Sequence, residues 1–206
     1  MSSVQLVSVF LVLLALLLDS GMSLVLPMDC SDIYNHSSSR PSGVYTIYPI
    51  GSTSAVQVFQ RRMDSSVNFY RLWDHYKTGF GNAVGEYWLG LETLSHLSLR
   101  KNYELLVDME DFAAAKFSLG AGDSLSNNNN GQKFTTLDKD QDTHEYNCAR
   151  SHLGGFWYSN CHHTNPNGVY RWGADDTIFA IGVSWFHWKG HNYSLKSISM
   201  KVRPVQ

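Results

Sequence analysis

The sequence predicts a single α+β domain that is rich in loops, and three observations lead to this prediction. First, 206 residues are enough for one domain with a substantial core but short for two. Second, short runs of alternating apolar residues indicate strands, whereas long helical periodicity is absent. Third, aromatic residues make up 13% of the chain and charged residues 17%, a composition that favours a folded core over disorder.

Four segments of the chain carry strand patterns. They are Glu86–Leu91, Tyr103–Met109, Phe179–Trp185 and Tyr193–Val202. In the last of these, Ile198, Met200 and Val202 share one face, as expected for a strand with one buried side. Helical patterns are confined to two short segments, Leu91–Arg100 and Cys148–His152. The residues therefore predict short strands and a few short helices, joined by loops rich in Gly and Asn.

The N-terminal region has the pattern of a secretory signal. Residues Val4–Leu18 form an apolar run of about 15 residues, shorter than the ~20 that a membrane-spanning helix needs. Small residues follow at Asp19–Ser23, which suits cleavage by signal peptidase. We therefore expect a signal peptide at 1–23, a short head at 24–41 and the folded domain at 42–206. The alternatives for the apolar run are an uncleaved anchor and a buried helix.

Charge and targeting narrow the class of partner. The net charge of −2 argues against nucleic acid, because binding to phosphates needs a concentrated basic face. We expect no membrane span in the mature chain, and a location in the extracellular space or matrix. Two sequons, beginning at Asn35 and Asn192, predict N-glycosylation in that compartment.

The chain has three cysteines, and two of them lie close together. Cys148 and Cys161 bracket twelve residues. In an oxidising compartment the simple interpretation is a disulfide, which would add about 3 kcal/mol in the chain-entropy model. The competing interpretation is a zinc site, although neither a His-Glu-x-x-His motif nor paired Cys-x-x-Cys arms are present. The histidines available to such a site are His144, His152, His162 and His163.

An acidic stretch precedes these cysteines. The segment Asp138–Asp142 has carboxylates at alternate positions, and such oxygens can converge on Ca²⁺. It is not an EF-hand, because Thr143 stands where the loop needs glycine and Ala149 where it needs glutamate. A solvated acidic turn is the alternative. The residues alone leave both interpretations open.

Several long motifs together resemble the fibrinogen-related domain, and the resemblance covers essentially the whole mature chain. The motifs are Val58–Asp64, Ser66–Tyr70, Glu86–Leu91, Asp138–Asp142, Asn147–Ala149, Phe156–His162, Asn165–Tyr170 and the ending Tyr193–Pro204. The resemblance implies a fold of short antiparallel strands with a loop-rich subdomain for calcium and ligand. It also implies a recognition domain and not an enzyme, which agrees with the absence of a positioned nucleophile and base in the sequence.

The resemblance implies specific calcium ligands. Asp140 and Asp142 would supply carboxylates, and His144 and Tyr146 would supply backbone carbonyl oxygens. Oxygen donors on a loop are the ligands that Ca²⁺ prefers, so the chemistry agrees with the family pattern. In the family the cysteine that follows this loop is bridged, which favours the pairing of Cys148 with Cys161.

The resemblance also implies a ligand pocket beside the calcium loop. In the family this pocket contains a cis peptide before the Cys-His pair and an aromatic cage around an acetyl group. Its residues correspond here to Cys161, His162, His152, Phe179 and Ala180, and a further funnel aromatic falls at His191. Histidine and phenylalanine in place of tyrosines remove hydroxyl contacts. We therefore expect either calcium-dependent binding of acetylated glycans in innate defence, or a matrix adaptor for microfibril and elastic-fibre proteins without lectin activity.

Two family segments are missing from this sequence. One would lie between Gln57 and Val58, and the other near Ala115–Gly120. The first missing segment includes the usual partner of Cys30, which is therefore unpaired within the chain and could join two chains into a homo-oligomer. Loss of these segments is expected to leave strand edges and part of the core uncovered.

Overall fold

The computed structural model describes residues 56–99, 102–117, 122–126 and 128–205. The predicted signal peptide, the head, Cys30 and Asn35 lie outside these residues. Within the described part, no helix is both long and apolar enough to cross a membrane.

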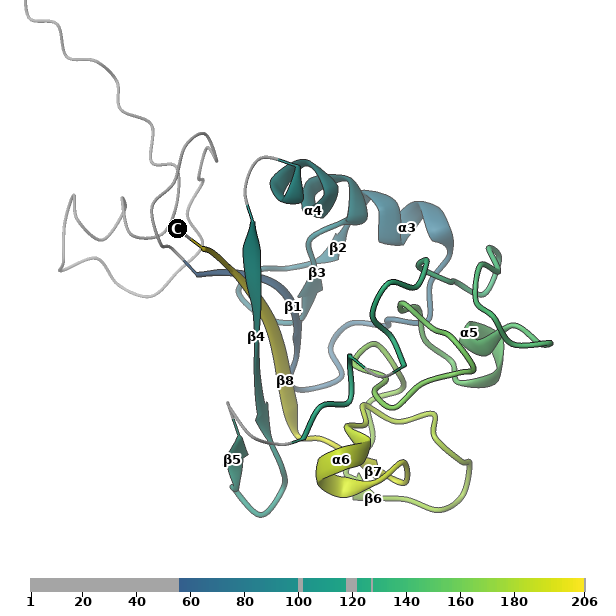
Figure 1. The fold of residues 1–206 in the computed structure, drawn as a ribbon. Coiled ribbons are helices and arrows are strands. Elements are labelled where there is room, and N and C mark those ends of the chain that lie inside the picture. Colours follow the sequence, from purple (N-terminus) through teal and green to yellow (C-terminus); the bar gives the residue numbers. More distant parts are fainter. Residues whose placement is uncertain (1–55, 100–101, 118–121, 127, 206) are drawn as a thin grey trace, which may run out of the picture.

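A six-stranded antiparallel sheet forms one side of the molecule, and a loop-rich region forms the other (Figure 1). The sheet has the order β2-β3-β1-β8-β4-β5. Its strands are β1 (Gln57–Arg62), β2 (Phe80–Gly81), β3 (Tyr87–Trp88), β4 (Tyr103–Glu110), β5 (Lys116–Phe117) and β8 (Ser197–Pro204). The predicted α+β class with short antiparallel strands is confirmed.

The remaining elements are short. The helices are α3 (Trp73–Thr78), α4 (Leu91–Ser98), α5 (Cys148–Ser151) and α6 (Phe186–Lys189). A second sheet pairs only β6 (Gly173–Ala174) with β7 (Tyr193–Ser194). The helices α4 and α5 confirm the two helices predicted from the sequence. The loops that carry the candidate site lie between β5 and β8 in sequence and cluster around α5 and α6 (Figure 1).

The longest strand pair, β4 with β8, shows the alternation that the sequence predicts. Tyr103 pairs with Pro204 and Glu110 with Ser197, in an unbroken register. On β8, Ile198 and Met200 are each 1% exposed, whereas Ser197, Ser199 and Lys201 are less buried. Cross-strand ion pairs support the register on the other face. These pairs are Glu104 with Arg203 and Asp108 with Lys201, and Lys196, just before β8, forms a further ion pair with Glu110.

The predicted strand Phe179–Trp185 is wrong. The segment makes only isolated bridges, from Gly182 to Val169 and from Trp185 to Thr164 and to Gly190. Ala180 has a φ of 58°, in the left-handed region, which breaks an extended conformation. The run is apolar because Ile181 and Val183 are buried in the loop-rich region. An apolar run indicates that its side chains are buried, and buried side chains do not require the backbone to pair with a neighbouring strand.

A buried ion pair joins the sheet to the loop-rich region. Arg62 and Glu86 are 2% and 0% exposed, with Nε and Oε1 3.5 Å apart. Arg62 also donates to the carbonyl oxygen of Gly168 at 2.6 Å, and its guanidinium lies over the ring of Phe69. Glu86 accepts backbone N–H bonds at both oxygens, from Met63, Asp64, Ser65 and Val67. Burial lowers the pKa of Arg62 and the charge of Glu86 counters this effect.

The outer edge of β4 is only partly covered. The short strand β5 pairs with Met109 and Glu110, and no other described strand adjoins β4 on that side. Beside this edge, a groove of about 750 Å³ opens between α4 and the sheet. Its lining includes Leu94, Leu105 and Val202, and Leu105 is 45% exposed.

Candidate functional site

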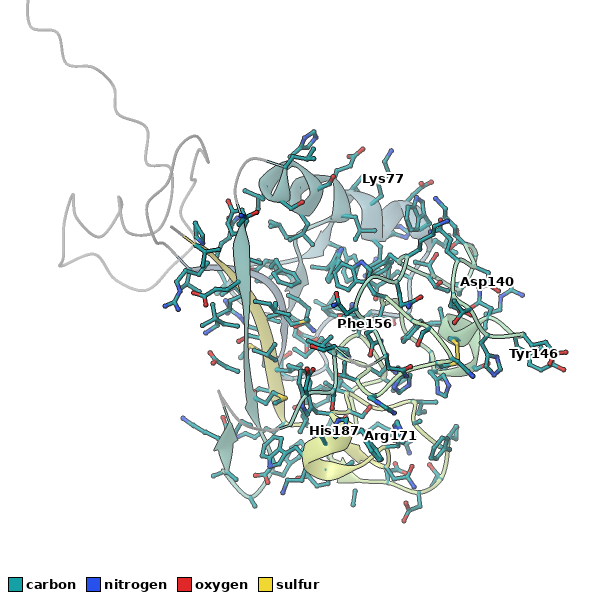
Figure 2. The ribbon with its side chains drawn as sticks, viewed as in Figure 1. Lys77, Asp140, Tyr146, Phe156, Arg171 and His187 are labelled. Atoms are coloured by element: carbon teal, nitrogen blue, oxygen red, sulfur yellow. A yellow bond between two sulfur atoms is a disulfide. The ribbon has the colours of Figure 1, made fainter. Side chains whose placement is uncertain are left out.

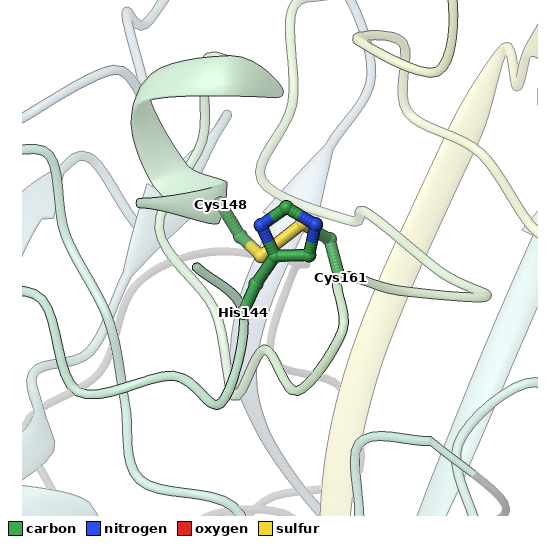
Figure 3. A group of neighbouring side chains, drawn as sticks. All are labelled: His144, Cys148 and Cys161. Carbon is green, nitrogen blue, oxygen red and sulfur yellow. A yellow bond between two sulfur atoms is a disulfide. The ribbon is translucent and has the colours of Figure 1, made fainter. Parts of the chain in front are cut away.

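The disulfide between Cys148 and Cys161 holds the candidate site together, and it confirms the predicted pairing. The two Cα atoms are 5.4 Å apart, and Cys148 is fully buried. His144 lies beside the bridge (Figure 3). Among the described residues, these three are the only group of His, Cys, Asp or Glu whose ligand atoms all lie within 4.8 Å of one another. Because both sulfur atoms are in the disulfide, they cannot act as thiolates, and the alternative of a zinc site with cysteine ligands is wrong.

The three carboxylates of the acidic stretch have different surroundings. Asp138 bonds to neighbouring segments, whereas Asp140 and Asp142 lie on the loop that follows. Asp138 accepts hydrogen bonds from the Trp73 N–H and the Thr136 hydroxyl, both at 2.8 Å. It therefore fixes α3 to the loop. Asp140 and Asp142 lie further along, and the Asp142 N–H is 3.4 Å from Oδ1 of Asp140. Figure 2 shows Asp140 and Tyr146 on the same side of the loop-rich region.

Asp142 connects the loop to the start of α5. Its Oδ1 accepts the N–H of His144 at 3.0 Å, and its Oδ2 accepts the N–H of Cys148 at 2.9 Å. Burial raises the pKa of Asp142, and the neighbouring charge of Asp140 acts in the same direction. The ionised form of Asp142 is thus disfavoured where it stands. A bound cation would relieve both effects, so this pair of carboxylates has the electrostatics of a cation-binding loop.

The two predicted carbonyl donors lie on the same turn. Tyr146 donates its N–H to Nδ1 of His144 at 3.0 Å, and the Tyr146 carbonyl oxygen is 3.1 Å from the same nitrogen. Tyr146 is 65% exposed. Both residues follow the two carboxylates closely in the sequence, and the turn lies at the surface, where an ion can enter from solvent.

The second half of the site is a cluster of aromatic rings. His162 is 5% exposed, and its Nε2 lies 3.1 Å from the carbonyl oxygen of Ala180. Since a carbonyl can only accept, Nε2 carries the proton of this ring. The ring of His162 lies 4.6 Å from that of His152 and 5.5 Å from that of His191. Phe179 is 63% exposed, and the centre of its ring lies 5.3 Å from that of His191. The structure thus brings together all the residues that the family resemblance assigns to the pocket.

One feature of the expected pocket is absent. No cis peptide occurs among the described residues, so the bond before Cys161 is trans. A cis bond to a residue other than proline costs about 3 kcal/mol, and it persists only where the surroundings enforce it. Here Ser159 closes the turn by donating its N–H to the Cys161 carbonyl at 2.9 Å. The expectation of a cis peptide at this position is therefore wrong for this structure.

Burial keeps the pocket histidines uncharged. The pKa of His162 lies well below its ordinary value, chiefly because the ring is buried, and the charges of His152 and His191 add to the effect. Burial also lowers the pKa of His152 and of His191. At neutral pH these rings therefore act as neutral imidazoles.

These shifts predict a loss of stability in mild acid. An unfolded histidine takes up a proton near pH 6.5, whereas the folded rings resist protonation, so the unfolded state binds more protons as the pH falls. We expect the free energy of unfolding to fall from about pH 7 downward, as measured by urea denaturation at a series of pH values. The variant His162→Gln should show a weaker pH dependence, whereas His75→Gln should keep it. Equal profiles for all three proteins would contradict this account.

The structure adds residues to the pocket that the sequence did not assign. The ring of His163 stacks on that of Phe186, with the ring centres 5.2 Å apart, and its centre lies 5.4 Å from that of His187. The ring centre of Phe186 also lies 4.7 Å from that of His191. The sequence offered His163 only as a histidine available to the alternative zinc site, and His187 carried no motif. The available signal was composition, because five of the nine histidines fall between residues 152 and 191.

Comparison with known proteins establishes the class. The family model for the C-terminal globular domain of fibrinogen beta and gamma chains matches residues 26–121 and 113–205. The chain therefore belongs to the family of fibrinogen C-terminal domains. The two matched parts meet at 113–121, the region where the sequence predicts a missing segment.

Individual relatives share this domain. Microfibril-associated glycoprotein 4 of Mus musculus is 43% identical over 219 residues, covering 86% of this chain and 84% of the relative. Fibrinogen C domain-containing protein 1 of Homo sapiens is 39% identical over 211 residues, covering 82% of this chain. This chain spans only 45% of that second relative. The first alignment is longer than the portion of this chain that it covers, so the relative carries residues inside the domain that this chain lacks.

Solved structures agree on the fold. The fibrinogen-like globe domain of human ANGPTL2 superposes with a TM-score of 0.78 at 37% identity, covering 86% of this chain and 99% of that domain. The corresponding domain of human ANGPTL6 gives a TM-score of 0.77 at 34% identity. The likeness includes both the sheet and the loop-rich region that carries the candidate site, because nearly all of each domain is matched.

Proposed function

We propose that this chain is a secreted recognition protein that binds acetylated glycans in a calcium-dependent manner, as part of innate defence. The observation that supports it most is the pocket beside the acidic loop. Phe179 presents an exposed ring over His191, while Ala180 and His162 form a buried base. An exposed aromatic ring beside a small buried side chain, Ala180, suits a small methyl group carried by a polar sugar.

Calcium would act on this pocket through the disulfide. Asp142 accepts the N–H of Cys148, and Cys148 is joined to Cys161, whose neighbour is His162. Carboxylates of Asp140 and Asp142, with carbonyls of His144 and Tyr146, are the oxygen donors that Ca²⁺ prefers. Ca²⁺ in this loop would hold the start of α5 and, through the bridge, the turn that carries His162.

We expect Ca²⁺ to stabilise the protein through Asp140 and Asp142. Thermal melting should rise when Ca²⁺ is added and fall again with chelator. At a free concentration about 100 times Kd the gain would be about 2.7 kcal/mol. Asp142→Asn and Asp140→Asn should remove this response. Glu145→Gln, which removes the same charge from an exposed neighbour in the loop, should keep it. A response that survives both aspartate variants would contradict the proposed ligands.

Glycan binding is tested separately, on beads that carry N-acetylated sugar. We expect retention with Ca²⁺, release by chelator, and elution by free acetate or N-acetylglucosamine. Replacing the exposed Phe179 by alanine should weaken retention without changing the calcium-dependent melting. Absence of calcium-dependent retention by the unmodified protein would reject the lectin function while leaving the calcium site standing.

A second function is favoured by the relatives. Microfibril-associated glycoprotein 4 is similar over most of its length, which favours an adaptor that binds microfibril or elastic-fibre proteins in the extracellular matrix. In that case the pocket would have no lectin activity, and matrix binding would persist in the Phe179→Ala variant. Loss of matrix binding in that variant would instead assign both activities to one surface. A homo-oligomer linked through Cys30, and glycosylation at Asn35 and at the exposed Asn192, remain predictions of the sequence.

A further inference from the structure

The outer edge of β4 lacks the features that normally keep an edge strand from pairing with another molecule. On this side β5 pairs only with Met109 and Glu110, so Tyr103–Val107 has no partner strand among the described residues (Figure 1). Natural edge strands are protected by lysine, proline or β-bulges. This stretch reads Tyr-Glu-Leu-Leu-Val in an unbroken register with β8, and its one charged residue, Glu104, is paired with Arg203.

The direction of the backbone shows which groups of β4 lie on this edge. The carbonyl oxygen of Asn102 accepts the N–H of Val205, on the β8 side, at 2.9 Å. The N–H of Asp111 points the other way and donates to the carbonyl of Ala115, on the β5 side, at 3.1 Å. Backbone groups of successive residues point to opposite edges of a strand, so the odd-numbered residues of β4 present their N–H and C=O groups to the outer edge. These residues are Tyr103, Leu105 and Val107.

A second copy of this edge fits the pattern in an antiparallel register. With a two-fold axis at Leu105, this residue lies opposite Leu105 of the second copy, and Tyr103 lies opposite Val107. Every pair then joins residues whose backbone groups face the edge, so each pair exchanges two N–H···O bonds. The side chains match as well, because an aromatic residue opposite a β-branched residue stabilises antiparallel strands.

Charge disfavours the registers in which the axis lies one residue away. An axis at Glu104 would place this carboxylate opposite its own copy, and an axis at Leu106 would place Glu104 opposite Asp108. Like charges directly opposite each other destabilise a sheet. With the axis at Leu105, Glu104 lies opposite Leu106 and keeps its ion pair with Arg203.

The groove beside β4 adds apolar surface to the same edge. It has a volume of about 750 Å³, and none of the described residues that line it is charged. Leu105 is one of these residues and is 45% exposed. Because Leu105 lies at the two-fold axis, the grooves of the two copies would adjoin there. Pairing would therefore remove apolar surface from water in addition to satisfying backbone groups.

We propose that this chain forms a homodimer through antiparallel pairing of the outer edges of β4, with the two-fold axis at Leu105. The partner is a second copy of the chain, because the edge is complementary to itself in backbone hydrogen bonds, side-chain size and charge. This interface is distinct from the disulfide link predicted at Cys30. The proposal rests neither on calcium nor on glycan binding.

The test is sedimentation equilibrium of the mature chain over a series of concentrations, in a Cys30→Ser background that prevents a disulfide link. We expect a reversible dimer. Leu105→Lys should weaken dimerisation at least about tenfold, because two lysines would face each other where two leucines pair. Leu99→Lys changes a leucine that is 80% exposed outside β4 and should leave the dimer unchanged.

Charge complementation tests the register. Leu105→Glu should also be monomeric alone, whereas an equimolar mixture of Leu105→Lys and Leu105→Glu should dimerise, because opposite charges then meet at the axis. This rescue also shows that both variants fold. A monomer at every concentration, or a dimer that Leu105→Lys leaves intact, would overturn the proposal.

Hydrogen exchange separates a second copy from another part of the same chain. The amides of Tyr103, Leu105 and Val107 should become more protected as the protein concentration rises. Protection that is independent of concentration would mean that the chain covers its own edge, and it would overturn the proposed dimer.

Discussion

Replacing Glu86 by glutamine is expected to lower the free energy of unfolding by about 3–5 kcal/mol, because the change leaves Arg62 as a buried charge without a counter-ion. Arg62 is 2% exposed and cannot reach water without disrupting the contact between the sheet and Gly168. The neutral amide also presents only one acceptor oxygen to the four N–H groups that Glu86 now binds. Urea denaturation of the two proteins measures the difference directly.

The matched control is Glu92→Gln. Glu92 forms an ion pair with Lys77 at 3.2 Å, and these side chains are 55% and 47% exposed. Exposed pairs of this kind contribute about 0–1 kcal/mol, so the control should unfold almost as the unmodified protein does. A Glu86→Gln variant whose stability matches that of Glu92→Gln would show that the buried pair does not anchor the loop-rich region to the sheet.

Removing the disulfide by the double substitution Cys148→Ala and Cys161→Ala is expected to lower the free energy of unfolding by about 3 kcal/mol. The bridge closes a loop with a sequence separation of 13, and its loss restores conformational freedom to the unfolded chain. Cys148 is also fully buried beside the core, so the smaller alanine loses packing there. Chemical denaturation under non-reducing conditions gives the difference.

Reductant provides the control for this experiment. Dithiothreitol should destabilise the unmodified protein to a similar extent and have no further effect on the double variant. The variant Cys30→Ser removes the third thiol, and we expect reductant to destabilise it as much as it destabilises the unmodified protein. If reductant leaves the unmodified protein unchanged, the bridge does not contribute to stability in the way proposed.

The local features of this protein were largely predictable from the sequence. Alternation on Ile198 and Met200 predicted the buried face of β8, and the resemblance of the Cys148–Cys161 region to the fibrinogen-related domain implied the bridge. Both rest on information that lies within a short stretch of chain. The strand prediction failed at Phe179–Trp185, because the apolar residues of this segment are buried in a loop without pairing as a strand.

Contacts between distant segments were not predictable in this way. Nothing in either motif indicates that Arg62 and Glu86 pair, and that geometry depends on the Gly168 carbonyl and on four backbone N–H groups. Likewise, no motif indicated that His163 contacts Phe186 and His187, and only the folding of the loops brings these rings together.

The sequence by itself determined the family, the α+β class, the local disulfide and the acidic loop, because each is encoded in contiguous motifs or in residue periodicity. The tertiary structure alone decided which carboxylate is structural, where the sheet edge of β4 is left uncovered, and that His163 and His187 join the cluster around His162. The physical reason is that side-chain burial, hydrogen-bond partners and pKa shifts depend on neighbours contributed by remote parts of the chain. These neighbours make Asp138 a structural anchor for α3, and they raise the pKa of Asp142 through burial and the nearby charge of Asp140.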